Sequence, residues 1–381
     1  MSRLDELIAE LCPDGVEYKK IGELVNYEQP SKYIVKSTDY NDAFETPVLT
    51  AGQTFILGYT NEENGHYLAS KENPVIIFDD FTGAFKWVDF EFKVKSSAMK
   101  ILTANKTLTS IRYIFHVMGK LNFTSSEHKR LWIGTYSEFE VPVPPLEVQR
   151  EIVRILDNFT ELIAELIAEL TARKQQYEYY AEKLLSFDDT YDYLPLSDVA
   201  DFRNGKGHEK SIVASGKYIV VNSKFISTNG EVKKYANEQI SPLYSSDILM
   251  VMSDLPNGRA LAKTFLVDED DTYTLNQRIC ALHVKNEDQY MTKFLYFFLN
   301  RNPQLLKYDN GVDQTNLKKG DILSVQVPVI SIETQKSTIS FLERLETLCL
   351  DISSGLPAEI EARQKQYEYY RDKLLTFKEL N

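Results

Sequence analysis

The chain has 381 residues, more than one hydrophobic core usually serves, so its length predicts two or three domains. Hydrophobic residues make up 43% and charged residues 26%, which is an ordinary globular composition and excludes disordered or collagen-like protein classes. The net charge is −13 and no segment of the chain forms a basic tail, which disfavours a protein that binds the phosphate backbone alone and non-specifically.

The same composition excludes several cellular contexts. No apolar run approaches the roughly 18 to 20 residues that span a bilayer, and the acidic start of the chain does not resemble a signal peptide, so we expect a cytoplasmic protein without membrane contact. The three cysteines lie far apart without CxxC spacing, and the five histidines form no pair at ligand spacing. We therefore expect neither disulfides nor a bound metal.

Residues 1–145 predict a β-rich globular head, because they combine alternating apolar runs, frequent turn signals and little helical periodicity. Pro74–Phe78 and Phe85–Phe90 are the clearest apolar runs of this kind. An apolar helical stretch follows at Ile111–Met118.

Residues 146–190 predict a long helix from Leu146 to Phe187, roughly 60 Å at ~1.5 Å per residue. Apolar residues recur in alternating steps of four and three, the spacing of a coiled-coil seam. Three tandem four-residue units, Thr160–Ile163, Ala164–Ile167 and Ala168–Thr171, each add about one turn, so their number adjusts the length of the helix.

Residues 191–330 repeat the order of the first head. Asp247–Val251 corresponds to the first apolar run, Leu261–Phe265 to the second, and Met291–Leu299 to the helical stretch. Identity between the two segments is low. They are therefore interpreted as diverged copies of one domain.

Residues 331–381 predict a second spacer helix, in which Gly355 and Pro357 break or kink the chain. Two internal repeats relate it to the first. Val141–Gln149 recurs as Val327–Gln335; the segment Arg173–Phe187 recurs as Arg363–Phe377 with ten of fifteen positions identical.

These features together predict an α+β protein with a pseudo-two-fold axis. Two similar β-rich heads are separated and braced by two long helices, which form an antiparallel intramolecular coiled coil because a lone seam would expose a long apolar stripe. In the alternative, each helix packs independently on its own domain.

The duplicated blocks around Val141–Gln149 and Arg173–Phe187, the tandem Glu-Leu units and the opening Cys12-Pro-Asp-Gly-Val-Glu-Tyr18 resemble the specificity subunit of type I restriction–modification enzymes over essentially the whole chain. The resemblance implies two target-recognition domains, each reading one half of a bipartite, asymmetric double-stranded DNA site. It also implies that the helices set the gap between half-sites, that a four-residue unit changes this gap, and that the helices dock two modification (methyltransferase) subunits, to which restriction subunits are added.

In this interpretation the chain is not an enzyme and carries no cofactor of its own. S-adenosylmethionine, ATP and Mg²⁺ are expected in the partner subunits. Consistent with this, the sequence has no Asn-Pro-Pro-Tyr or Asp-Pro-Pro-Tyr methyltransferase motif and no Walker A motif.

Base reading in a major groove needs Arg or Lys for guanine and Asn or Gln for adenine on loops or edges. The first head offers candidates at Gln53, Thr82, Lys86, Ser125, His128, Lys129 and Arg130. The second head offers Arg203, Asn204, Lys206, Lys210, Asn257, Arg259, Gln314, Asn316, Lys318 and Lys319. Each of these side chains could instead be an ordinary solvated loop residue. In the spacer helices, Tyr177, Tyr180, Tyr367 and Tyr370 are interpreted as coiled-coil packing and partner-docking residues rather than base-stacking residues.

Two other functions stay open. Asp80, Glu91 and Lys93 imitate the Asp…Glu-x-Lys spacing of Mg²⁺-dependent nucleases, although alternating surface charges on neighbouring strands give the same pattern and the second head has no counterpart. The chain could also be a coiled-coil scaffold without a role in nucleic-acid binding.

Overall fold

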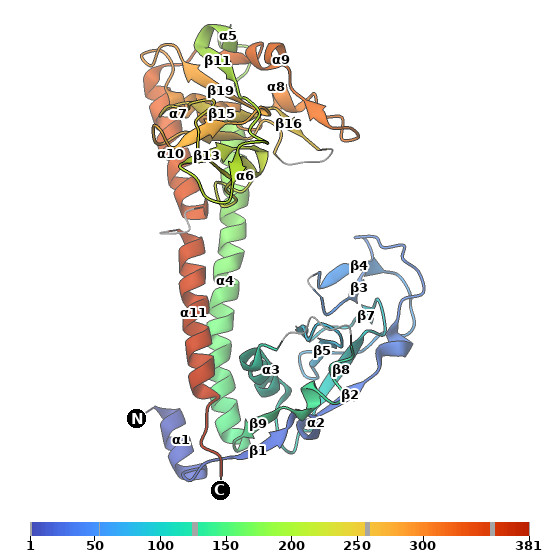
Figure 1. Ribbon diagram of the computed structural model, residues 1–381. Helices are drawn as coiled ribbons and strands as arrows, with labels where there is room; N and C mark the ends of the chain where they lie inside the picture. The colour runs from blue at the N-terminus through green and yellow to red at the C-terminus, as the bar shows by residue number, and fades with distance from the viewer. Residues whose placement is uncertain (1, 53, 124–128, 256–259, 351–354, 381) are drawn as a thin grey trace. The chain divides into compact units, whose positions relative to one another are not determined.

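The computed structural model describes residues 2–52, 54–123, 129–255, 260–350 and 355–380 (Figure 1). The chain forms two compact units. Unit 1 comprises Met1–Ala168 with Glu359–Asn381, and unit 2 comprises Glu169–Ala358. Each unit therefore combines one head with helical segments from two distant parts of the chain. Within the described ranges, no helix is both long and apolar enough to cross a membrane.

The head of unit 1 is rich in strands and has one main helix. Its strands are β1 Glu17–Lys20, β2 Val25–Glu28, β3 Thr46–Leu49, β4 Ile56–Thr60, β5 Val75–Asp79, β6 Phe85–Val88, β7 Lys93–Val94, β8 Met99–Ala104 and β9 Glu140–Val143. Its helices are α1 Arg3–Leu11, α2 Ile21–Leu24 and α3 Ile111–Leu121, with 3-10 turns η1 Pro30–Tyr33 and η2 Tyr136–Glu138. The main sheet is antiparallel in the order β2-β8-β5-β6, and a second sheet has the order β4-β3-β7.

The head of unit 2 has the same layout. Its strands are β10 Tyr193–Pro195, β11 Ala200–Asn204, β12 Ile212–Val213, β13 Tyr218–Val221, β14 Tyr235–Ala236, β15 Ile248–Val251, β16 Ser253–Asp254, β17 Thr264–Leu266, β18 Tyr273–Leu275, β19 Ile279–Val284, β20 Thr315–Asn316 and β21 Gln326–Pro328. Its helices are α5 Leu196–Val199, α6 Ser223–Ser227, α7 Thr292–Leu299, α8 Pro303–Leu306 and α9 Lys319–Leu323. The main antiparallel sheet has the order β11-β19-β15-β17, and a second sheet has the order β12-β14-β13-β18.

The two heads are therefore copies of one topology, as the sequence predicts. The main sheets have matching strand orders, and each second sheet contains one parallel pair, β3 with β7 in unit 1 and β13 with β18 in unit 2. The first and last strands of each head also pair, β1 with β9 and β10 with β21. The predicted runs lie on β5, β6, β15 and β17, and the predicted helical stretches lie on α3 and α7.

Among the described residues, the spacer region contains the helices α4 Leu146–Leu185, α10 Ile332–Leu350 and α11 Leu356–Leu374. In unit 1, α4 packs on α11, where the rings of Phe159 and Tyr370 stack with centroids 5.3 Å apart. In unit 2, α4 packs on α10, where Tyr180 meets Phe341 edge-on at 5.2 Å. These pairings confirm the predicted coiled-coil helices. The predicted break falls between α10 and α11, partly at residues 351–354, which lie outside the described residues.

The apolar periodicities explain the core. In unit 1, one face of the main sheet contributes Ile76, Phe78 and Leu102, because alternate residues of a strand point to the same face. The helix α4 contributes Ile152 and Leu156 at a four-residue step to the same core. Each head is thus joined to its spacer through a continuous apolar interior.

One buried glutamine at the end of each repeat ties the head to the spacer. The Gln149 side chain accepts hydrogen bonds from Ser110 N (3.2 Å) and Thr109 Oγ1 (2.9 Å) at the start of α3, and it donates to Leu108 O and Pro144 O. Gln335 accepts from Met291 N (2.8 Å) at the start of α7 and donates to Gln289 O and Ile330 O. Both amides are fully buried, so the repeated segments carry an equivalent joint in each unit.

Candidate nucleic-acid interface

The same junction occurs at one end of the main sheet in both heads. In unit 1, the segment after α3 meets the turn after β5, where Leu131 N donates to Asp80 O at 2.7 Å. In unit 2, Leu317 N donates to Met252 O at 2.8 Å. Leu131 and Leu317 are 186 residues apart, the spacing that also separates Val141 from Val327. The two junctions are therefore equivalent positions of the repeat.

This equivalence relates two sets of candidates that the sequence does not connect. Lys129 and Arg130 immediately precede Leu131 and are exposed. The corresponding positions before Leu317 are Thr315 and Asn316, and Asn316 is exposed. Gln314, Lys318 and Lys319 flank the same residue of unit 2, so the junction brings these candidates together in one place. Gln53, Ser125, His128, Asn257 and Arg259 lie outside the described residues.

In unit 1, buried charges hold the junction. Asp80 is 1% exposed and lies 3.2 Å from Nζ of Lys100, which is fully buried. The Asp80 carboxylate also accepts from Trp132 N at 2.8 Å. Asp79 Oδ1 accepts from Thr82 N at 2.9 Å. The candidate Thr82 therefore sits on a firmly hydrogen-bonded turn, whereas Lys86 lies on β6, an edge strand of the main sheet.

The turn between β5 and β6 requires a glycine. Gly83 has φ +78°, a left-handed conformation that side chains rarely adopt, and a Cβ there would lie 2.8 Å from Phe123 O. The backbone of Gly83 thus lies directly against Phe123, in the segment that follows α3. The backbone of this junction is therefore fixed from both sides.

In unit 2, strand pairing and hydrogen bonds to backbone groups and polar side chains hold the junction. Strand β16 pairs with β20, which places Ser253 opposite Asn316. The Gln314 amide donates to Ser253 Oγ at 2.7 Å. Asp254 Oδ2 accepts from Ala260 N at 2.7 Å and from Leu261 N at 3.2 Å. These bonds tie the end of β16 to the residues that precede β17.

Two candidate lysines begin α9 beside this junction. Lys318 is the N-cap residue, and its backbone N–H donates to Asp321 Oδ2 at 2.8 Å. Lys319 Nζ lies 5.4 Å from the centroid of the Phe202 ring. Both residues are exposed. Two exposed lysines therefore lie beside the junction of unit 2 although the chain as a whole is acidic.

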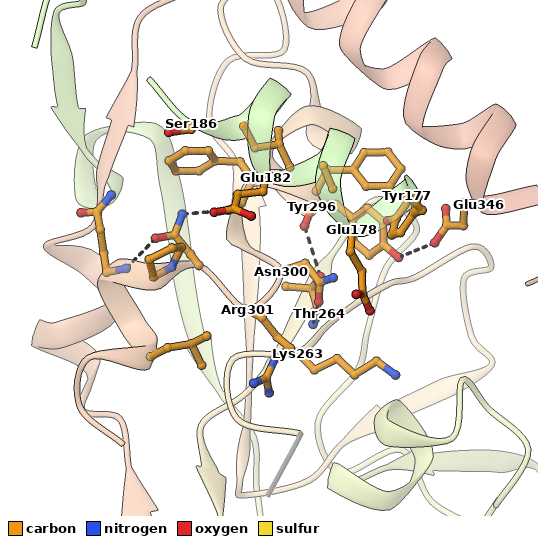
Figure 2. A pocket seen from close by; sticks show the side chains of 18 of the residues that line it. Tyr177, Glu178, Glu182, Ser186, Lys263, Thr264, Tyr296, Asn300, Arg301 and Glu346 are labelled. Atoms are coloured by element: carbon orange, nitrogen blue, oxygen red, sulfur yellow. Dashed lines mark hydrogen bonds between the residues drawn. The ribbon is translucent and has the colours of Figure 1, made fainter. Parts of the chain in front are cut away.

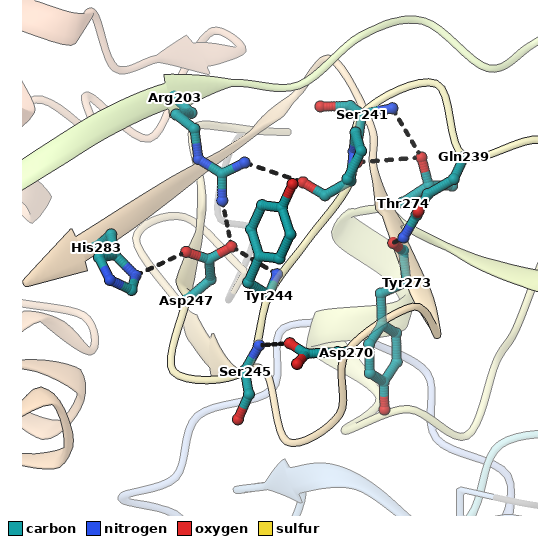
Figure 3. Close-up of polar contacts among 11 residues, drawn as sticks. Arg203, Gln239, Ser241, Tyr244, Ser245, Asp247, Asp270, Tyr273, Thr274 and His283 are labelled. Carbon is teal, nitrogen blue, oxygen red and sulfur yellow. Dashed lines mark hydrogen bonds and ion pairs between the residues drawn. The ribbon is translucent and has the colours of Figure 1, made fainter.

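Arg203 has a different environment from the one that the sequence suggests (Figure 3). Its guanidinium forms an ion pair with Asp247, donates to Pro242 O at 3.0 Å and lies over the Tyr244 ring. Asp247 is 1% exposed and also accepts from Tyr244 N and pairs with His283. Arg203 is thus committed to holding the start of β15 in place.

The candidates Asn204, Lys206 and Lys210 follow Arg203 in the sequence, on a loop that close packing and hydrogen bonds hold in place. Asn204 ends β11, and a Cβ on Gly205 would lie 2.0 Å from Asn276 O, so only glycine fits. Lys206 and Lys210 are exposed. Between them, His208 is buried and bonds to Lys206 O (2.7 Å) and Thr274 Oγ1 (2.9 Å). The loop presents its two lysines from a rigid base.

The predicted docking tyrosines lie within the helix packing. Tyr367 is buried, and its hydroxyl is 3.0 Å from Nδ1 of His116, whose Nε2 is 2.9 Å from Asp157 Oδ1. Burial lowers the pKa of the His116 imidazole, which favours its neutral form. Arg112 Nε donates to the same Asp157 oxygen at 2.7 Å. Three helices of unit 1 therefore meet at one polar cluster.

Unit 2 leaves a groove of about 1270 Å³ at its helix junction (Figure 2). Tyr177 lines it from α4, Tyr296 from α7 and Glu346 from α10. The Tyr296 hydroxyl contacts Glu346 Oε1 at 3.5 Å. Burial raises the pKa of Glu346 and that of Tyr177. In unit 2 the ion pair Lys293–Glu343 takes the place that the pair Arg112–Asp157 has in unit 1, between the head helix and the spacer helix.

The nuclease-like residues do not form one site. Asp80 pairs with Lys100, Glu91 pairs with His66, and Lys93 pairs with Glu62 at 3.0 Å. Lys93 is buried, and it also donates to Asn64 O. In the part of the chain that the structure describes, no group of three or more His, Cys, Asp and Glu side chains is placed to hold a metal ion. The arrangement therefore gives no support to metal-dependent cleavage.

Sequence reasoning missed the groups that fix the junctions and the helix joints. Lys100 is twenty residues from Asp80 and carries no motif, so nothing in the sequence marks it as the partner. Gln149 and Gln335 were visible as the last identical residues of a repeat, although their role was not. That identity is the signal that could have identified them as a shared structural joint.

Comparison with known proteins gives consistent matches. The family model described as the type I restriction modification DNA specificity domain matches residues 13–172 and 188–362. The specificity subunit of the EcoR124I/EcoR124II type I restriction enzyme of Escherichia coli is 40% identical, with 99% of this chain and 97% of that protein covered. The MjaVIII specificity subunit of Methanocaldococcus jannaschii is 22% identical over 93% and 91% of the two chains. The S subunit of a type I system from M. genitalium has a similar fold, with a TM-score of 0.57, 14% identity and coverage of 95% and 96%.

Proposed function

The chain belongs to the family of type I restriction–modification DNA specificity domains, and from this premise we propose that each head reads one half of a bipartite, asymmetric DNA target through the major groove. It is a DNA-specificity subunit of a type I restriction–modification system. The recurrence of one recognition junction in both heads supports the half-site assignment, since two copies of a reading surface suit a target with two parts.

The side chains at the two junctions suit different bases. Arg130 in unit 1 has the donor geometry for guanine, and Asn316 in unit 2 has the donor and acceptor needed for adenine. Lys129, Lys318 and Lys319 supply positive charge for phosphates beside the bases. A rigid backbone supports this assignment, because fixed loops hold side chains in register with a groove at little entropic cost.

We further propose that the chain performs no catalysis and works with two modification subunits. S-adenosylmethionine is then used by those subunits, and ATP and Mg²⁺ by restriction subunits joined to them. Partner subunits would supply much of the phosphate contact, which fits the net charge of −13 on this chain. Its cytoplasmic location stays a prediction. The tandem units of α4 set the half-site gap, so deleting Ala164–Ile167 shortens the gap and keeps both half-site sequences.

The half-site assignment is tested by long-read methylation sequencing of plasmid DNA from cells that co-express the chain with its modification subunit. We expect the wild type to give a gapped motif with one methylated adenine in each half. Arg130→Ala should relax one half only and Asn316→Ala the other half only, with discrimination at one base falling roughly ten- to hundredfold, since a bidentate base contact is worth about 1–3 kcal/mol. The exposed Lys71→Ala variant serves as the control and should leave both halves unchanged. A change in both halves from either single variant would contradict the assignment.

A further inference from the structure

The repeated segments Arg173–Phe187 and Arg363–Phe377 have the same pattern of burial along their length. Each contains three tyrosines, and the outer two of each set face the interior. Tyr370 stacks on Phe159, and Tyr180 packs on Phe341. The first tyrosine of each set, Tyr177 or Tyr367, is also largely covered. Packing alone therefore accounts for four of the six tyrosines.

The middle tyrosine of each set points to solvent. The exposed fraction is 59% for Tyr179 and 62% for Tyr369. Each ring makes the same edge-on contact with the next tyrosine, with centroids 5.3 Å apart in both units. The two side chains thus repeat in exposure and in orientation toward their neighbour.

The flanking exposed residues repeat as well. Glu178 and Glu368 precede the middle tyrosines, and Lys183 and Lys373 follow one helical turn later on the same face. All four are exposed. Each unit therefore presents a tyrosine accompanied by one negative and one positive charge.

The folded chain does not require these outward residues to match. The heads have diverged until the topology is what they share, and an exposed tyrosine gains little from burial in its own unit. The exposed residues of the two repeated segments match, so the reason for the match lies outside the chain. A partner that presents the same surface to each segment supplies such a reason. Tyrosine is enriched among residues that dominate protein–protein binding energy.

We propose that Tyr179 and Tyr369 are the central contact residues of two equivalent docking sites, each for one copy of the modification subunit. This inference rests on the proposed function, in which two such subunits bind. Each copy offers an apolar pocket for the phenol ring, flanked by a cation that faces Glu178 or Glu368 and an anion that faces Lys183 or Lys373. The docking residues are thus the outward tyrosines, whereas the inward ones hold the helices together.

The test measures how many modification subunits assemble with the full-length chain, using native mass spectrometry, and their affinities, using titration. We expect the wild type to bind two copies. Tyr179→Ala and Tyr369→Ala should each leave one tight site and weaken the other roughly 30-fold or more, as truncation of a dominant contact does. The double variant should bind neither copy tightly. Tyr179→Phe, which keeps the ring, should retain two.

Tyr308→Ala is the matched control, because Tyr308 is exposed (41%) but lies outside the repeats. It should bind two copies with wild-type affinity. Two tight copies on the double alanine variant would overturn the docking assignment and leave the proposed function intact. Equal weakening by Tyr308→Ala would overturn the assignment too, because the effect would not belong to the repeats. A wild-type chain that captures no modification subunit would overturn both proposals.

Discussion

The equivalent central strands β5 and β15 are anchored at opposite ends. In unit 1 the buried carboxylate is Asp80, which directly follows β5 and pairs with Lys100 at the junction with the segment after α3. In unit 2 it is Asp247, which directly precedes β15 and pairs with Arg203 away from that junction. The junction of unit 2 is held by neutral strand pairing instead. The same strand order thus tolerates different sources of rigidity, so the topology does not depend on any one buried charge.

The two heads also differ in the length of the turn that follows the central strand. Phe78 pairs with Phe85 across the turn of unit 1, which leaves six residues between them. Met250 pairs with Thr264 in unit 2, which leaves thirteen. The short turn is fixed by an ion pair and a glycine, and the long turn is closed by Asp254. The turn after the central strand can therefore differ in length between the heads while the strand order stays the same.

The largest expected effect comes from removing the buried charge of unit 1. Asp80→Asn leaves Lys100 charged and unpaired in the interior, so the free energy of unfolding should fall by about 3–5 kcal/mol. Asp254→Asn, at the corresponding turn of unit 2, should cost only about 1 kcal/mol because it keeps an acceptor for the backbone. Urea unfolding of the full chain measures both values. Equal losses in the two variants would contradict the contrast between the junctions. The double variant Asp80→Asn with Lys100→Met should recover most of the stability that Asp80→Asn loses.

A smaller effect tests what the two units share. Gln149→Leu and Gln335→Leu each leave buried backbone groups at the start of the head helix without a hydrogen-bond partner. Each should lower the free energy of unfolding by about 2–3 kcal/mol. The exposed Gln175→Leu variant should change it by less than about 0.5 kcal/mol. Thermal denaturation of the three variants compares them directly. A neutral result at only one of the two buried glutamines would show that the joints are not equivalent.

The smallest expected effect is the pH dependence that His116 adds to unit 1. Burial lowers the folded-state pKa of His116 below 6.5, so the unfolded chain binds the proton more readily. The stability contributed by neutral His116 is therefore fully present above pH 6.5 and is lost as the pH falls through the folded-state pKa. Replacement by phenylalanine, which unit 2 has as Phe297 at the corresponding position of α7, should remove this dependence of the free energy of unfolding on pH below 6.5. An unchanged slope, measured by unfolding across this range, would assign the dependence to another group.

The helical half of the architecture follows readily from the sequence. Steps of three and four residues predict α4 within two residues of its end at Leu185, because a seam repeats over many turns and averages out local exceptions. The correspondence of β5 with β15 also follows from the order of the apolar runs. The strand order of the sheets does not, because pairing such as β2 with β8 joins residues about 75 positions apart and leaves no local pattern.

The base-reading role of the candidate residues stays a prediction, and the sequence alone relates them only as segments. Composition identified the stretch around Arg130 and the stretch around Asn316, and the structure adds that the two are equivalent. Arg203 looked like an equally good reader, since its partner Asp247 lies 44 residues away and was not recognisable as such. The inward and outward tyrosines were also indistinguishable by composition, because which face of a helix is covered depends on the neighbouring helix.

The pairing of β1 with β9, and of β10 with β21, makes the chain enter and leave each head at one place. Whatever lies between those strands is a closed excursion whose length and content do not alter where the following helix begins. Such a head can lengthen a loop, shorten a strand or replace a contact residue without shifting the register of the coiled coil. A change within a head therefore leaves the start of the following helix in place.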